Sequence, residues 1–143
     1  MSVNTSPIFS SAGDIEWTTV QTAANTTYDG TIGTPAIVFS ASADGGFVQR
    51  IRFKASGSAT ATVARIFINN GLTTGSAANN VLFDEITLAA TSATQTAATA
   101  VYELPLNIAL PPGYRILTTL GTVQVTGGGW YAAAVGGSYA PIV

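Results

Sequence analysis

The sequence predicts a single all-β domain: a β-sandwich of about eight antiparallel strands with jelly-roll topology. Three observations support this prediction. Large apolar residues recur at every second position in several stretches, as they do in half-buried strands. Gly, Asn, Asp and Pro separate these stretches, and none of them has the period of an amphipathic helix. Hydrophobic residues make up 47% of the 143 residues, which is enough for one packed core.

The stretch from residue 101 to residue 121 has the clearest pattern. Its first half places five large side chains on one face of an extended strand, namely Tyr102, Leu104, Leu106, Ile108 and Leu110. Pro111 and Pro112 cannot donate to a ladder, and Gly113 tolerates a positive φ, so a turn is expected there. Tyr114 then begins a returning strand. The pattern predicts a strand–turn–strand unit with one apolar face.

Residues 1–13 form a separate segment ahead of the predicted sandwich, which spans residues 14–143. The segment is polar and rich in turn formers, and its exceptions are Ile8 and Phe9 after Pro7. An extended arm is expected. Two interpretations stay open for it: a frayed terminus, or a functional arm in which Ile8 and Phe9 are candidate contacts with a partner.

Further strands are expected along the rest of the chain. Trp17, in the first of them, is either a core anchor or an interface residue. Ala90 to Ala98 has no helical period and is predicted to be a loop. The remaining strands are predicted at residues 15–20, 36–40, 47–55, 60–69, 81–89 and 130–135.

The strand at residues 47–55 carries most of the positive charge of the chain. Alternation puts Phe47, Ile51, Phe53 and Ala55 on one face, and Val48, Arg50, Arg52 and Lys54 on the other. Arg50, Arg52 and Lys54 therefore form a candidate charged patch. Either the patch pairs with acidic residues across the sheet (Asp84, Glu85 and Glu103), or it binds a small anion or an acidic partner.

The strand at residues 60–69 is apolar on both faces. Ile66 and Ile68 lie on the face opposite to Val63 and Phe67. One face is expected to cover the core, so Val63 and Phe67 are candidates for a subunit interface. Charged residues are only 8% of the chain, which leaves little repulsion between copies and favours self-association.

Catalytic chemistry is not expected from this composition. The chain has no His and no Cys, so His-based acid–base catalysis, thiolate chemistry and the usual zinc sites are excluded, and no metal or cofactor is predicted. Asp84 and Glu85 are adjacent and would point to opposite faces of a strand, so they do not form a catalytic pair.

No nucleic acid, membrane or secretory role is expected either. The net charge is −2, with five basic residues, so a broad nucleic-acid footprint is not predicted. The longest apolar run, residues 130–135, is too short to span a membrane. The first 13 residues lack a basic start and an apolar core, so synthesis in the cytoplasm without a signal peptide is expected.

Several segments, taken in order, are similar to those of a known group of proteins. They are Asp29-Gly30-Thr31, residues 48–55, residues 64–68, residues 83–88, residues 110–116, Trp130-Tyr131-Ala132 and residues 136–139. This ordered set, across roughly residues 28–140, resembles small virion proteins of tailed bacteriophages that serve as capsid decoration, cement or minor structural proteins.

The resemblance implies a jelly-roll protein, commonly a homotrimer, bound to the major capsid protein on the exterior of the virion. It also implies an arm that reaches over the shell, and it supplies no catalytic residue. The alternative function is a glycan- or receptor-binding module on a phage tail or fibre, in which Trp130, Tyr131 and Tyr139 would stack on sugars. For Trp130, a place in the core is the competing interpretation.

Overall fold

The computed structural model describes residues 12–33 and 35–139, and over these residues the chain forms eight strands and one 3-10 turn. The elements are β1 (Ala12–Trp17), β2 (Ala36–Ser40), β3 (Gly46–Ala55), β4 (Thr62–Asn69), η1 (Ala77–Asn79), β5 (Asn80–Leu88), β6 (Val101–Leu110), β7 (Arg115–Leu120) and β8 (Trp130–Ser138). The all-β class predicted from the sequence is confirmed.

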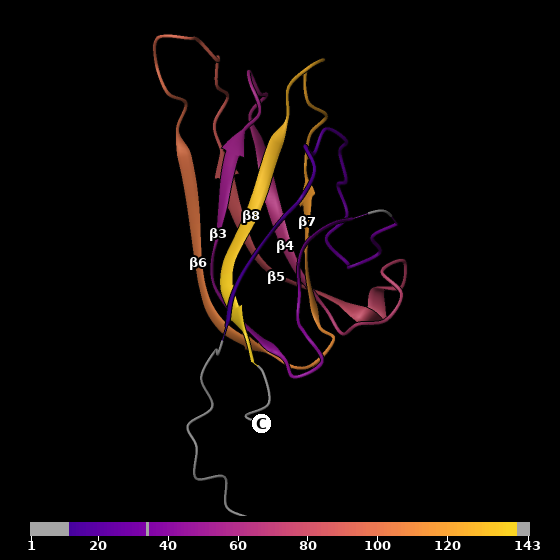
Figure 1. The fold of residues 1–143 in the computed structure, drawn as a ribbon. Helices are drawn as coiled ribbons and strands as arrows, with labels where there is room; N and C mark the ends of the chain where they lie inside the picture. Colours follow the sequence, from indigo (N-terminus) through magenta and orange to yellow (C-terminus); the bar gives the residue numbers. More distant parts are fainter. Residues whose placement is uncertain (1–11, 34, 140–143) are drawn as a thin grey trace, which may run out of the picture.

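The strands form two four-stranded antiparallel sheets that pack face to face. The front sheet has the order β1-β8-β3-β6, and the back sheet has the order β2-β7-β4-β5. Figure 1 shows β6, β3 and β8 side by side, with β4, β5 and β7 behind them. Consecutive strands mostly alternate between the sheets, and this order is that of a jelly roll.

The stretch at residues 101–121 contains two strands, as predicted, but they do not form a hairpin. β6 pairs with β3 in the front sheet, whereas β7 pairs with β2 and β4 in the back sheet. The turn at Pro111–Gly113 therefore carries the chain from one sheet to the other. Both strands direct large side chains into the same core, which is why their alternation looked like that of a single apolar hairpin.

The core lies between the two sheets. Its largest fully buried side chains include Phe39 from β2, Phe53 from β3 and Trp130 from β8. The Tyr102 ring meets that of Trp130 edge to face, with centroids 5.8 Å apart. Tyr102 belongs to the predicted inward face of β6, and the whole of that face packs against the core, as the alternation indicated.

A β-bulge in the front sheet changes which face of β3 each residue occupies. The register between β3 and β8 shifts between Val48 and Arg50, so Gln49 is the extra residue on β3. Val48 is fully buried, whereas Phe47 is only half-buried. The predicted shared face of Phe47 and Ile51 is therefore wrong, because simple alternation does not survive the inserted residue.

The edge strand β6 also departs from regular geometry where it passes this bulge. Its register with β3 shifts over the same step. Asn107 has a φ of 52°, the one positive value at a non-glycine residue in the part of the chain that the structure describes. Pro105, which has no N–H, lies two residues before it.

The outer face of the back sheet is covered by the chain itself. Residues 24–32, which we call the strap, run across it, and Ile32 forms a small buried cluster with Phe67 and Leu117. Arg65 holds the strap further along, because its guanidinium donates to the Tyr28 hydroxyl at 2.6 Å and lies 3.9 Å from the centroid of the Tyr28 ring.

The sandwich begins earlier than the sequence analysis proposed. Ala12 and Gly13, assigned there to the arm, belong to β1 and pair with Ser138 and Gly137 of β8. Residues 1–11 lie outside the described part of the chain, and so do the candidate contacts Ile8 and Phe9.

Candidate functional site

The three basic residues of β3 lie together on the outer face of the front sheet. Beyond the bulge, Arg50, Arg52 and Lys54 alternate with the buried Ile51 and Phe53. They face away from the core, as the sequence predicts for a candidate charged patch.

Only one carboxylate lies among these cations. Oε1 of Glu103 on β6 lies 3.0 Å from Nε of Arg52 and 3.6 Å from Nε of Arg50. The Lys54 ammonium donates to the backbone carbonyl of Thr99 instead. Of the three predicted acidic partners, Glu103 is therefore the correct one.

The other two predicted partners lie on the opposite sheet. Asp84 and Glu85 belong to β5, and Glu85 binds Arg65 with Oε1 3.0 Å from Nε. Prediction of these partners was wrong because strand order, which decides the neighbours of β3, is not encoded in alternation.

Exposed apolar side chains lie beside the basic residues on the same face. On β1, Trp17 is 68% exposed and Ile15 is 60% exposed, and Tyr131 on β8 is 41% exposed. The sequence analysis left Trp17 open between a core anchor and an interface residue. Its exposure in a sheet face that no described part of the chain covers favours the interface.

The strand registers set the arrangement of this face. One row across the sheet contains Trp17, Ala133, Arg52 and Glu103. The next row contains Ile15, Val135, Arg50 and Pro105. A third contains Tyr131, Lys54 and Val101. The apolar residues thus lie over β1 and β8 and the cations over β3, and we call these three rows the platform.

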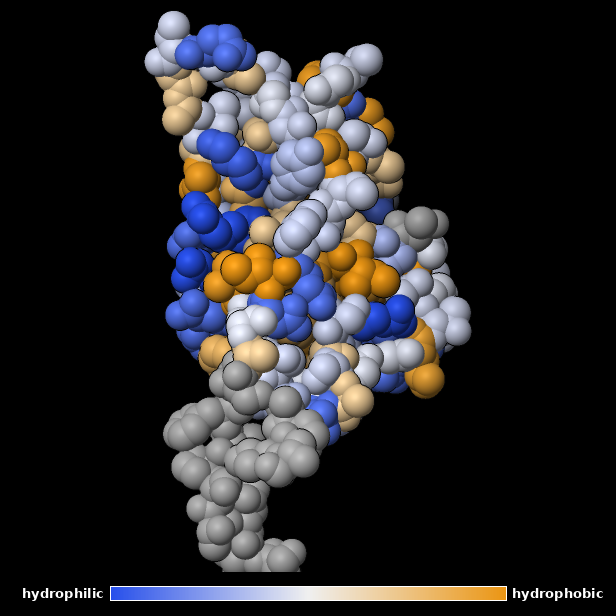
Figure 2. Space-filling view, in the orientation of Figure 1, coloured by the Kyte–Doolittle hydropathy of each residue, from blue (hydrophilic) through white to orange (hydrophobic). Residues whose placement is uncertain are grey.

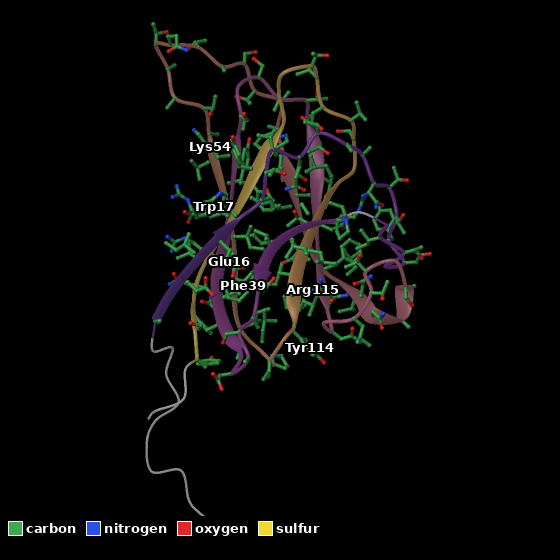
Figure 3. All side chains as sticks on the ribbon, turned by 45° about the vertical axis from the view of Figure 1, so that its right-hand side comes forward. Glu16, Trp17, Phe39, Lys54, Tyr114 and Arg115 are labelled. Atoms are coloured by element: carbon green, nitrogen blue, oxygen red, sulfur yellow. The ribbon has the colours of Figure 1, made fainter. Side chains whose placement is uncertain are left out.

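The figures agree with this arrangement. Figure 2 shows hydrophilic residues gathered along the β6 and β3 side of the visible face, with a hydrophobic group next to them. In Figure 3, Trp17 and Lys54 lie toward the front sheet, while Phe39 lies further in, between the two sheets.

A hydrogen bond between the two sheets holds the apolar edge of the platform. The backbone N–H of Ser40 on β2 donates to Oε2 of Glu16 at 2.6 Å. Burial raises the pKa of Glu16 above its ordinary value, and the nearby Asp14 carboxylate adds to this, while the Ser40 bond acts in the opposite direction. Glu16 thus anchors β1, and its neighbours Ile15 and Trp17 point outward.

The predicted subunit interface does not lie on an open surface. Phe67 is fully buried beneath Ile32 of its own chain, so the prediction that a neighbouring subunit covers it was wrong. Val63 is half-buried on the same face. The strap lies some 35 residues away in sequence, and its place over β4 was not visible from the local pattern.

The aromatic residues proposed for sugar stacking are not grouped on one surface. Trp130 is fully buried, and its indole N–H donates to the backbone carbonyl of Thr60 at 3.4 Å. The core interpretation of Trp130 is confirmed. Tyr131, the next residue, points to the other face of β8 and belongs to the platform.

A separate hollow of about 520 Å³ lies beside the chain that follows β1. Its polar lining includes Thr19, Gln21, Asn25, Thr118 and Thr119, and none of its lining residues is charged. Nε2 of Gln21 has no hydrogen-bond partner there. No general acid or base is available in this hollow for catalysis.

Groupings for metal chemistry or membrane insertion are also lacking within the part of the chain that the structure describes. No group of three or more Asp or Glu residues is placed to hold a metal ion. No helix in residues 12–33 and 35–139 is long and apolar enough to cross a membrane.

Over residues 12–33 and 35–139, the chain is thus a jelly-roll β-sandwich whose front sheet presents an exposed face of mixed apolar and basic side chains. Comparisons with known protein families, with curated proteins and with solved structures find no match to this chain.

Proposed function

We propose that this chain is a non-enzymatic virion structural protein that decorates or cements the exterior of a tailed-phage capsid, with the platform as its contact with the major capsid protein. The carrying observation is the exposure of Trp17, Ile15 and Tyr131 on a sheet face that residues 12–33 and 35–139 leave uncovered. The sequence resemblance is the reason to propose a phage capsid as the place of action. The platform is the surface that we propose for attachment to it.

The free energy available from covering Trp17 on the platform suits repeated weak contacts. Trp17 is the largest exposed side chain on it. Covering its exposed part would remove roughly 100–170 Å² from water, which corresponds to about 2.5–4 kcal/mol at ~25 cal/mol per Å². The translational, rotational and side-chain entropy that the partners lose on association offsets much of this gain in free energy. A protein attached at many equivalent positions, or as a homotrimer, gains avidity from each modest contact.

The test uses empty heads of the phage that encodes the chain, prepared without it. Wild-type protein should cosediment with the heads and saturate them. Trp17→Ala should reduce the apparent affinity at least about tenfold, because Trp residues dominate many interfaces. Leu72→Ala is the matched control, since Leu72 is 60% exposed but lies between β4 and η1, away from the platform.

Melting curves separate binding from folding in this experiment. Both side chains are exposed, so both variants should melt close to the wild type. Saturation of heads by Trp17→Ala at wild-type affinity would refute the platform as the contact. Failure of the wild-type protein to bind heads would refute capsid decoration itself.

Glycan binding on a tail or fibre is the competing function, and self-association is part of the proposal. Binding to a glycan array through Tyr131 would favour the competitor.

Sedimentation tests the homotrimer, which requires an apolar surface other than the buried Phe67. A species that stays at 14.5 kDa at high concentration would refute the homotrimer. Decoration of the capsid by monomers would then still stand as the proposal.

A further inference from the structure

The platform combines two chemistries side by side. Ile15, Trp17 and Tyr131 lie over β1 and β8, and the neighbouring strand β3 carries Arg50 and Arg52. Adjacent strands lie about 4.8 Å apart, so the apolar and basic parts are within about 10 Å of each other. One partner surface can therefore contact both parts at once.

The basic part is only partly neutralised by the residues that the structure describes. Arg50 and Arg52 share the single carboxylate of Glu103, and the ammonium of Lys54 binds a neutral carbonyl. Nε of Arg50 has no hydrogen-bond partner. With three cations and one carboxylate, the platform has a net charge of +2.

The rest of the molecule has the opposite sign. The chain has five basic and seven acidic residues, so two basic and six acidic residues remain outside the platform, with a net charge of −4. A protein of net charge −2 thus carries a cluster of positive charge beside its exposed Trp17.

This charge distribution argues against two other occupants. A second copy that docks face to face would bring two surfaces of charge +2 together, because a two-fold interface pairs each patch with itself. Nucleic acid needs several phosphate contacts, and duplex DNA has one charge per about 1.7 Å of its axis, far denser than the three cations here.

From these observations we propose that the platform binds an acidic protein surface that has exposed apolar side chains beside its carboxylates. Carboxylates of the partner would lie over β3, and its apolar residues would lie over Trp17 and Ile15. Four strands and six residues along each give a face of about 19 by 20 Å, or roughly 400 Å². This is about half of a standard interface per partner, so each contact is weak and salt-sensitive.

This inference deepens the proposed function, because on a capsid the acidic surface would belong to the shell. The experiment therefore uses two probes, empty heads and a random copolymer of glutamate and tyrosine. The readout on the copolymer is tryptophan emission excited at about 295 nm, which avoids tyrosine. Trp17 is exposed and Trp130 is fully buried. A blue shift of the emission on binding therefore indicates that the copolymer shields Trp17 from water.

Two double variants with the same change in net charge provide the comparison. Arg52→Gln with Lys54→Gln removes two charges from the platform. Thr87→Glu with Ala78→Glu adds two negative charges at exposed positions of β5 and η1, on the back-sheet side. The expected result is copolymer binding with a blue shift, at least tenfold weaker at 500 mM than at 50 mM NaCl. The platform variant should lose at least tenfold in affinity, and the control should stay within about twofold.

The other outcomes are equally informative. Equal losses in both variants would overturn the inference, because net charge alone would then explain binding. Head binding without copolymer binding would overturn the acidic partner and leave capsid decoration standing. Copolymer binding without head binding would support the acidic partner and refute decoration. Tighter binding to single-stranded DNA than to the copolymer, or an oligomer that Trp17→Ala abolishes, would overturn the inference in favour of that occupant.

Discussion

Gly136 lies where the bulged part of β3 passes β8, and an Ala there should be strongly destabilising. Gly136 pairs with Val48, at the register shift that directs Arg50 outward. A Cβ placed on Gly136 would overlap the carbonyl oxygen of Phe47, and the contact is with backbone, which cannot rotate away. The two central strands of the front sheet would have to separate locally.

The cost can be worked from this geometry. Overpacking in a well-packed interior costs about 1–3 kcal/mol. Separation of the strands weakens about two ladder hydrogen bonds, at about 0.5–1.5 kcal/mol each. The expected loss for Gly136→Ala is therefore about 2–6 kcal/mol. In a domain of this size that lowers the melting temperature by roughly 6 °C or more.

Gly13 provides the matched control in the same sheet. It lies in β1, and a Cβ there would have no atom within 4 Å. Gly13→Ala should be neutral or slightly stabilising, by up to about 1 kcal/mol, because Ala restricts the unfolded chain. Thermal and urea unfolding of both variants decide the matter. Equal melting temperatures would mean that β3 and β8 do not approach closely at the bulge.

Three further predictions concern other parts of the fold. Asn107→Gly should be nearly neutral by urea unfolding and Asn107→Ala should cost about 1 kcal/mol, since its φ is 52°; equal effects would contradict a left-handed residue there. Tyr28→Phe should cost about 1 kcal/mol, because Arg65 loses a bond on a side chain only 7% exposed; no loss would mean that water replaces the hydroxyl. Glu16 has a raised pKa in the folded state, so it binds its proton more tightly there and contributes stability at low pH that is lost as the pH rises through that pKa. Glu16→Gln should therefore be more favourable, relative to wild type, at pH 7 than at pH 4, and a pH-independent difference would refute this.

Much of the fold could be predicted from local patterns. The inward face of β6 follows strict alternation from Tyr102 to Leu110, and it packs on the core as predicted. The two faces of β4 were also distinguished correctly, because Ile66 and Phe67 lie in different buried clusters. A period of two is sufficient to assign faces within a regular strand.

Features that depend on distant segments could not be predicted. The cover over Phe67 comes from Ile32, which no local pattern connects to β4. The bulge at Gln49 leaves no mark in composition, although it decides the positions of Phe47 and Val48.

The candidate site was predicted in part. The three cations of β3 were identified as a patch, whereas Trp17 was left open between core and interface, Tyr131 was proposed only for sugar stacking, and Ile15 was given no role. Ile15 and Trp17 alternate correctly in the predicted first strand, and the sequence does not state whether a second layer covers them.

The irregular geometry of β6 has a consequence for solubility at high local density. A long edge strand with free N–H and C=O groups can template the addition of another strand. β6 has ten residues and lies at the edge of the front sheet, but Pro105 lacks a donor and Asn107 turns the backbone out of the extended path. A strand of a neighbouring copy cannot continue the ladder past these two positions. Copies with few surface charges can therefore stand close together without joining through their β6 edges into fibres.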